Sequence, residues 1–182
     1  MWDLGAASRQ PSVSVELLKD KKFAQLVSLA FSGDSGCSLT AIDDRGRVWA
    51  AWPCQDAVGL RQPVTLEGAG KFDRASIAAD GRTAVARKGA NVQVWDLASS
   101  TLTATLEGHA KDISCVCISA DGRLAVSGGE DRAVRVWDLQ SGSYVQTLTG
   151  HTTCVAQVAI SGDGSCVVSA GGSGVLRAWQ RV

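Results

Sequence analysis

Short apolar segments recur along the chain, and pairs of turn-forming residues separate them. In the best-defined stretch the segments are residues 113–119, 123–128, 133–139 and 143–149, all rich in β-branched and apolar residues. Asp-Gly, Gly-Gly or Ser-Gly pairs lie between them, as tight hairpins require. No stretch shows an apolar period of 3.6 over a dozen residues, so the pattern predicts an all-β chain of four short antiparallel strands per group.

The groups form a sequence repeat with a period of 42 residues, which is the spacing between Trp95, Trp137 and Trp179. "VQVWDL" at 92–97 returns as "VRVWDL" at 134–139 and more loosely as "LRAWQ" at 176–180. "TLEG" at 65–68 returns at 105–108 and as "TLTG" at 147–150. His109 precedes Trp137 by 28 residues, and His151 precedes Trp179 by the same number. The chain therefore uses one structural unit at least three times.

A Gly-His pair, an Asp-Gly hairpin, a Ser-Gly-x-x-Asp turn and a Trp-Asp ending, repeated at this interval, resemble the WD40 repeat family. The resemblance is strong over 101–182, clear over 63–100 and weak over 12–52, where Trp49 and Trp52 both remain candidates for the Trp-Asp position. It implies a β-propeller, whose four-stranded blades surround a central channel. We therefore expect about four blades in an open partial propeller.

The resemblance divides a single WD40-repeat domain, residues 1–182, into unequal units. These are the remnant of a preceding blade plus an outer strand (1–18), a degenerate repeat (19–62), a repeat (63–100), a repeat with all signature residues (101–142), and a repeat lacking its outer strand (143–182). Because sheet edges need pairing or protection, three interpretations stay open. The chain is part of a larger propeller, or residues 12–18 pair with 174–180 and close a four-bladed ring, or a second copy or another protein supplies the missing blades.

In WD40 blades the Gly-His histidine, a serine, the turn aspartate and the tryptophan form a buried hydrogen-bonded set. The resemblance assigns this tetrad to His109, Ser127, Asp131 and Trp137. A buried imidazole needs partners on both ring nitrogens, which the acid and the alcohol can supply. The other units keep only part of the set. The last unit keeps His151, Ser169 and Trp179, and Ser173 replaces the aspartate. The second unit keeps only Trp95, with Gly68 and Ala69 in place of the Gly-His pair and Gly89 in place of the aspartate.

The same His, Ser and Asp could instead form a hydrolase triad, or the cysteines could bind metal. A nucleophilic Ser127 would need exposure near an oxyanion hole, yet it ends an apolar strand and lies outside any Gly-x-Ser-x-Gly motif. Cys115 and Cys117, or His151 with Cys154, lack the four-ligand spacing of a zinc site. We therefore predict no enzyme activity, no metal and no cofactor.

In this family, residues at the entrance of the innermost strand and just before the turn aspartate line one rim and often contact partners. Mapped through the repeat, the rim changes from mixed charge through acidic to neutral and small. Its predicted members are Lys71, Asp73, Lys88, Asp112, Ser114, Glu130, Cys154, Ala156 and Gly172.

Composition narrows the partners. Eighteen basic and eighteen acidic residues give zero net charge, which argues against a nucleic-acid surface, and no apolar run approaches the length of a membrane span. The six cysteines lack a compact disulfide framework, so we expect an intracellular, cytoplasmic location, with the nucleus also possible. The predicted function is a non-enzymatic scaffold for protein or peptide partners. The alternatives are the hydrolase and the sensing end of a NACHT-type signalling ATPase.

Overall fold

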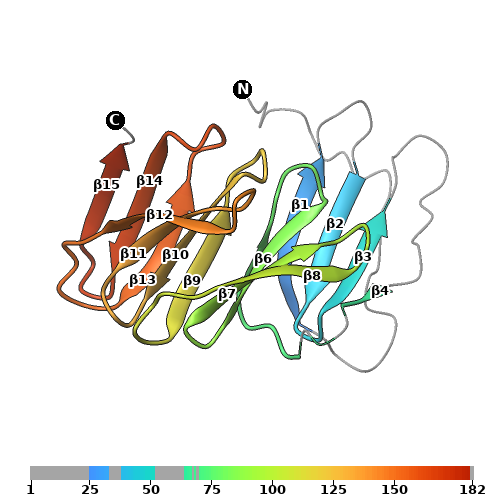
Figure 1. Ribbon diagram of the computed structural model, residues 1–182, viewed down its shortest axis with the longest axis horizontal. Helices are drawn as coiled ribbons and strands as arrows, with labels where there is room; N and C mark the ends of the chain where they lie inside the picture. The colour runs from blue at the N-terminus through green and yellow to red at the C-terminus, as the bar shows by residue number, and fades with distance from the viewer. Residues whose placement is uncertain (1–24, 33–37, 52–63, 67, 69, 181–182) are drawn as a thin grey trace, which may run out of the picture.

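The computed structural model describes residues 25–32, 38–51, 64–66, 68 and 70–180, and every regular element within them is a β-strand. The strands form four antiparallel sheets, which follow one another in chain order along the long axis of the molecule (Figure 1). This confirms the predicted all-β fold with about four blades. The described residues contain no helix long and apolar enough to cross a membrane.

Each sheet is a meander, in which strands that follow one another in the chain pair antiparallel. The first sheet contains β1 (Leu26–Ser32), β2 (Ser38–Asp43), β3 (Arg47–Ala51) and β4 (Val64–Thr65). The second contains β5 (Ala75–Ile77), β6 (Thr83–Lys88), β7 (Asn91–Asp96) and β8 (Thr101–Leu106). The third contains β9 (Ile113–Ile118), β10 (Leu124–Gly129), β11 (Val134–Asp138) and β12 (Ser143–Leu148). The last contains β13 (Val155–Ile160), β14 (Cys166–Gly171) and β15 (Leu176–Gln180).

The strands of the third sheet agree with the four predicted segments to within one or two residues at each end. The hairpins between the first two strands of the last three sheets are Asp-Gly turns. Their glycines, Gly81, Gly122 and Gly164, have φ between 68° and 72°, a left-handed conformation that glycine adopts without steric cost. The predicted remnant at 1–18, and with it any pairing of residues 12–18 with β15, lies outside the described residues.

The apolar core lies between the sheets, in three separate layers. One cluster fills the space between the first and second sheets and contains Trp95, the next contains Trp137, and Trp179 packs against the third. A strand in the middle of the stack is therefore buried on both faces, as β10 is from Ala125 to Gly129. This explains why its sequence, LAVSGG, contains no charged residue and no alternation of apolar and polar positions.

Sequence units and sheets are offset by one strand. The segment 101–142 contributes β8 to the second sheet and β9, β10 and β11 to the third. The repeated Thr-Leu pair at the start of each unit thus ends the outer strand of the preceding sheet, where Leu66 and Leu106 are each only 2% exposed. Each unit consequently links two sheets, which couples neighbouring sheets through the chain itself.

Candidate functional site

A chain of hydrogen bonds joins His109, Ser127, Asp131 and Trp137 in the third sheet. The indole Nε1 of Trp137 donates to Ser127 Oγ at 2.8 Å, and the same oxygen lies 2.8 Å from His109 Nε2. On the other side of the ring, His109 Nδ1 lies 2.9 Å from Asp131 Oδ2. One arrangement satisfies every group: Trp137 donates to Ser127, Ser127 donates to Nε2, and Nδ1–H donates to Asp131.

This tetrad ties the loop before β9 to the hairpin between β10 and β11. Asp131 also accepts hydrogen bonds from the backbone N–H of Ala110 at 3.1 Å and of Ala133 at 3.2 Å. A side chain at Gly129 would not fit, because a β-carbon there would lie 3.0 Å from His109 Nδ1 and 2.9 Å from Asp131 Oδ1. The loop, the hairpin and the imidazole are therefore packed as one body.

Burial sets the protonation state of the tetrad. Burial lowers the pKa of His109, and the hydrogen bond to Asp131, which raises it, does not compensate. For the Asp131 carboxyl, burial raises the pKa, but the hydrogen bonds from Ala110 and His109 outweigh it and bring the pKa below its ordinary value. The stable state at neutral pH is thus a neutral imidazole beside an ionised carboxylate.

The lowered pKa of His109 predicts a loss of stability below pH 6.5. Between the folded and unfolded pKa values the unfolded chain binds more protons, so the free energy of unfolding falls as the pH drops. The loss is at most about 1.4 kcal/mol per pH unit for one histidine. Burial and Arg177 lower the pKa of His151 as well, so it contributes in the same direction.

Urea unfolding at pH 7.5 and 5.5 measures this effect. The carboxyls with lowered pKa, such as Asp131, lose their contribution only near pH 4 and below, outside this interval. The variant His109→Gln should show a smaller difference between the two pH values than the wild type. An equal difference in both proteins would contradict the assignment to His109.

The geometry does not suit Ser127 to nucleophilic attack. Its side chain is fully buried, at 0% exposure, and its hydroxyl already bonds both Trp137 and His109. A hydrolase triad requires the serine oxygen to face a substrate beside oxyanion donors. The arrangement instead holds a loop against inner strands, as the resemblance implies for this set.

The last sheet contains three members of the set. His151 Nε2 lies 2.8 Å from Ser169 Oγ, which also accepts the Nε1–H of Trp179 at 3.0 Å. Ser173 occupies the place of Asp131, but its hydroxyl accepts from Thr153 Oγ1 at 3.4 Å. The hairpin is thus joined to the loop through a threonine, with the imidazole left out of that connection.

The second sheet replaces the polar set with apolar contacts, and Phe72 is the residue that sequence reasoning missed. Phe72 is 2% exposed, and its ring meets Trp95 edge to face with centroids 6.1 Å apart. Its backbone N–H donates to Asp44 of the first sheet, as Ile113 donates to Gly89. Only its place at the entrance of an innermost strand, equivalent to that of Ile113 in the third sheet, could have identified it.

Trp95 also has a consequence for stability, because its buried Nε1 finds no hydrogen-bond partner among the described residues. Ala86 stands where the third sheet has Ser127, directly across from Gln93, whose buried Oε1 is likewise unpaired there. Since Ala86, Gln93 and Trp95 share one face of the sheet, a hydroxyl at position 86 can accept from the indole and donate to the amide.

We expect Ala86→Ser to raise the free energy of unfolding by about 1–2 kcal/mol, since it satisfies two buried polar groups. Urea unfolding would measure the change. Ala125→Ser is the matched control: Ala125 is equally buried, but the indole of Trp137 on its sheet already has a partner. A loss of stability in both variants would contradict the prediction.

The first sheet departs from the repeat. Its second hairpin has the same length as that of the third sheet, with Ile42 paired to Val48 as Gly128 is to Val134. Counting from these pairs places Ala51 where Trp137 stands and puts Trp49 two residues earlier; Trp52 lies outside the described residues. Asp43 organises this hairpin, because its side chain is buried and bonds the Nε of Arg47 at 2.6 Å.

The predicted rim residues lie at one end of the sheets, where each innermost strand begins and the hairpin between the second and third strands turns. Asp112 and Glu130 are joined there by a hydrogen bond from the Glu130 N–H to the Asp112 carbonyl at 2.9 Å. Cys154 and Gly172 make the same contact in the last sheet. All nine side chains or backbones are exposed, except Ser114, which is half-buried.

The cysteines of the described residues are free thiols, and two of them pack between the third and fourth sheets. Burial raises the pKa of Cys115 to about 11 and that of Cys117 to about 12, so both stay protonated at neutral pH. No three histidine, cysteine or acidic residues in the described part of the chain lie close enough to hold a metal ion.

Known proteins share this repeat and this architecture. The model of the WD domain, G-beta repeat, matches residues 100–138 and 142–180. Two similar solved structures are that of U3-55K, at 22% identity, and that of the RRP9 WD40 repeats, at 21%, each with a TM-score of 0.67. Each comparison covers 87% of this chain, which spans about half the length of those chains, 49% and 48%. No curated protein matches the sequence.

Proposed function

Because residues 100–138 and 142–180 make this chain a WD40-repeat protein, we propose that it acts as a non-enzymatic scaffold for protein–protein interaction. The observation that supports this most is the contrast between tetrad and rim. The His, Ser and Asp that could have formed a catalytic site take part in a buried hydrogen-bond chain, whereas the rim side chains of Asp112 and Glu130 beside them are exposed.

Rigidity makes such a rim a useful docking surface. The tetrad fixes the loop before β9, and the Glu130–Asp112 bond fixes the hairpin next to it. A surface that is already ordered loses little conformational entropy when a partner binds, so more of the contact energy becomes affinity.

Charge along the rim suggests where a partner would be recognised. Lys71 and Lys88 lie on the second sheet, Asp112 and Glu130 on the third, and the last sheet has Cys154, Ala156 and Gly172. Asp73 is paired with Arg87 at 3.1 Å. We propose a protein or peptide partner that places basic groups over the third sheet, and neither nucleic acid nor a membrane as the ligand, in keeping with the zero net charge of the chain.

We also propose a source for the remaining blades of the propeller. The solved structures similar to this chain are about twice its length, so the sheets missing from a full ring would come from the rest of a longer chain or from a second subunit. We propose an intracellular location, which the free thiols of the described cysteines support, because reducing compartments keep thiols unpaired.

A charge-reversal experiment tests the rim. The double variant Asp112→Lys/Glu130→Lys changes two exposed side chains, and Ser99→Lys, in the exposed turn between β7 and β8 at the opposite end of the sheets, is its control. Peptides selected from a random phage-displayed library by the wild-type protein should lose at least ten-fold in affinity for the double variant and keep their affinity for the control. Equal binding to all three proteins, or failure to select any peptide, would argue against the rim as the docking surface.

A further inference from the structure

Beyond the rim, a groove lies between neighbouring sheets at the opposite end of the molecule. It occurs twice in the described residues, between the second and third sheets and between the third and fourth. The two grooves are equivalent by position, because each lies beside an Asp-Gly hairpin and the outer strand of the preceding sheet. The second and third sheets both have four strands, and a groove lies between them too. A groove of this kind is therefore a feature of the contact between two neighbouring sheets.

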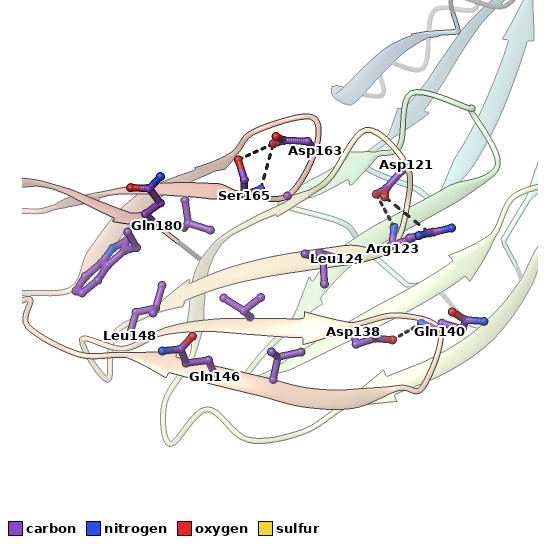
Figure 2. Close-up of a pocket in the computed structure, with 15 residues that line it drawn as sticks. Asp121, Arg123, Leu124, Asp138, Gln140, Gln146, Leu148, Asp163, Ser165 and Gln180 are labelled. Atoms are coloured by element: carbon purple, nitrogen blue, oxygen red, sulfur yellow. Dashed lines mark hydrogen bonds and ion pairs between the residues drawn. The ribbon is translucent and has the colours of Figure 1, made fainter. Parts of the chain in front are cut away.

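The groove between the third and fourth sheets has a volume of about 340 Å³, within the range of pockets that bind ligands. Figure 2 shows its lining, in which aliphatic side chains such as Leu124 and Leu148 lie between polar ones. The apolar lining residues come from both sheets and comprise Leu124, Val136, Val145, Leu148, Val167 and Trp179.

The margins of the two grooves differ in charge at two positions of the later hairpin. Asp163 lines the groove between the third and fourth sheets, whereas the equivalent Asp121 does not line the other groove, and Ser165 stands where the other groove has Arg123. The Asp-Gly turns continue with Arg82 and Arg123 in the second and third sheets, but with Ser165 in the fourth. The groove between the second and third sheets is therefore balanced, with two aspartates and two arginines in its lining. The groove between the third and fourth has three aspartates and one arginine, a net charge of −2.

The carboxylates have capacity for a ligand. Within each turn the hydrogen bonds to Asp121, Asp138 and Asp163 all use Oδ1, but Asp121 Oδ2 also forms an ion pair with Arg123 Nε at 3.8 Å. Oδ2 of Asp138 and of Asp163 bonds none of the described residues, so it is available to accept further bonds. Hydrogen bonds from Ser161 and Ser165 lower the pKa of Asp163 to about 2, which keeps it ionised at neutral pH. The described residues lack a cluster compact enough for a metal ion, so the carboxylates suit cationic groups spaced along a longer ligand.

We propose that the groove between the third and fourth sheets binds an extended peptide in which basic side chains flank an aliphatic one. The aliphatic side chain would contact the floor at Leu124 and Leu148, and the basic groups would bind the carboxylates of the margin. This site is separate from the rim, on the opposite ends of the same strands, so either can exist without the other.

Binding of a labelled peptide to the full chain tests the site. The probe is a fluorescein-labelled peptide with the core Arg-Leu-Arg, and its controls carry Glu-Leu-Glu and Arg-Ser-Arg. We expect fluorescence polarisation at low salt to show binding of the first peptide, and at least ten-fold weaker binding of each control. Equal binding of Glu-Leu-Glu, or no binding of Arg-Leu-Arg, overturns the proposal.

A substitution in the groove tests whether the peptide binds there. Ser165→Arg restores the arginine that the other two hairpins carry at an exposed turn position, and should weaken Arg-Leu-Arg binding about ten-fold. Thr152→Arg adds the same charge at an exposed position of the rim end and should leave binding within two-fold. An equal loss in both variants would indicate non-specific attraction and overturn the site, as would no loss in Ser165→Arg.

Discussion

Replacing Ser127 by alanine is expected to lower the free energy of unfolding by about 2–4 kcal/mol. The Ser127 hydroxyl accepts from Trp137 Nε1 and bonds His109 Nε2, both at 2.8 Å, and all three side chains are buried. Without it, two buried polar groups lose their partner at once, and each such loss costs about 1–3 kcal/mol.

The second sheet has an alanine at the position equivalent to Ser127, so we expect Ser127→Ala to fold. Trp95 of the second sheet is buried with Ala86 in the equivalent position, and its Nε1 has no hydrogen-bond partner in the described part of the chain. Urea unfolding followed by circular dichroism would give the change in free energy. Ser143→Ala, at an exposed position of β12, should change stability by less than about 0.5 kcal/mol. Similar stabilities of Ser127→Ala and the wild type would show that the tetrad does not support the fold.

Replacing Gly128 by alanine is expected to cost about 2–3 kcal/mol by forcing the third and fourth sheets apart. A β-carbon at Gly128 would lie 2.5 Å from Val155 Cγ1 and 2.9 Å from Cys115 Sγ. Val155 is fully buried and Cys115 is 4% exposed, so neither side chain can move into solvent. The clash lies in the middle of the apolar layer between the two sheets.

A second substitution tests whether this clash is the cause. Val155→Ala removes the nearest atoms, so the double variant Gly128→Ala/Val155→Ala should be more stable than the sum of the two single effects predicts. Gly162→Ala is the control, because its added β-carbon would make only an ordinary contact, 3.6 Å from Ala120. Additive effects in the double variant would rule out a direct clash between these positions.

Much of the fold could be predicted because its information is local and repeated. The strands of the third sheet follow from short apolar runs between turn residues, and the 42-residue spacing of Trp95, Trp137 and Trp179 shows that the same unit recurs. The residues grouped by the WD40 resemblance, His109, Ser127, Asp131 and Trp137, lie in hydrogen-bond contact in the structure. Such a repeat specifies its own strand pairing, because each strand pairs with the next.

Other features could not be predicted because they depend on contacts between sheets. The part played by Phe72 depends on the ring of Trp95, which it meets only once the second sheet has formed. The tryptophan position of the first sheet depends on hairpin length, and the register assigns it to Ala51, although Trp49 and Trp52 were the sequence candidates. The acidic groove combines three turns from two sheets, so that no single segment reveals it.

By itself, the sequence determined the all-β class and the repeating unit, since hairpin propensity and repeat spacing act within some 40 residues, and the members of the buried tetrad followed from the resemblance to the WD40 family. Only the tertiary structure decided which polar groups find partners, which exposed ends form the rim, and how the charge of each groove balances. Those properties arise where one sheet faces the next, and they depend on distances between side chains that the linear order of residues does not contain.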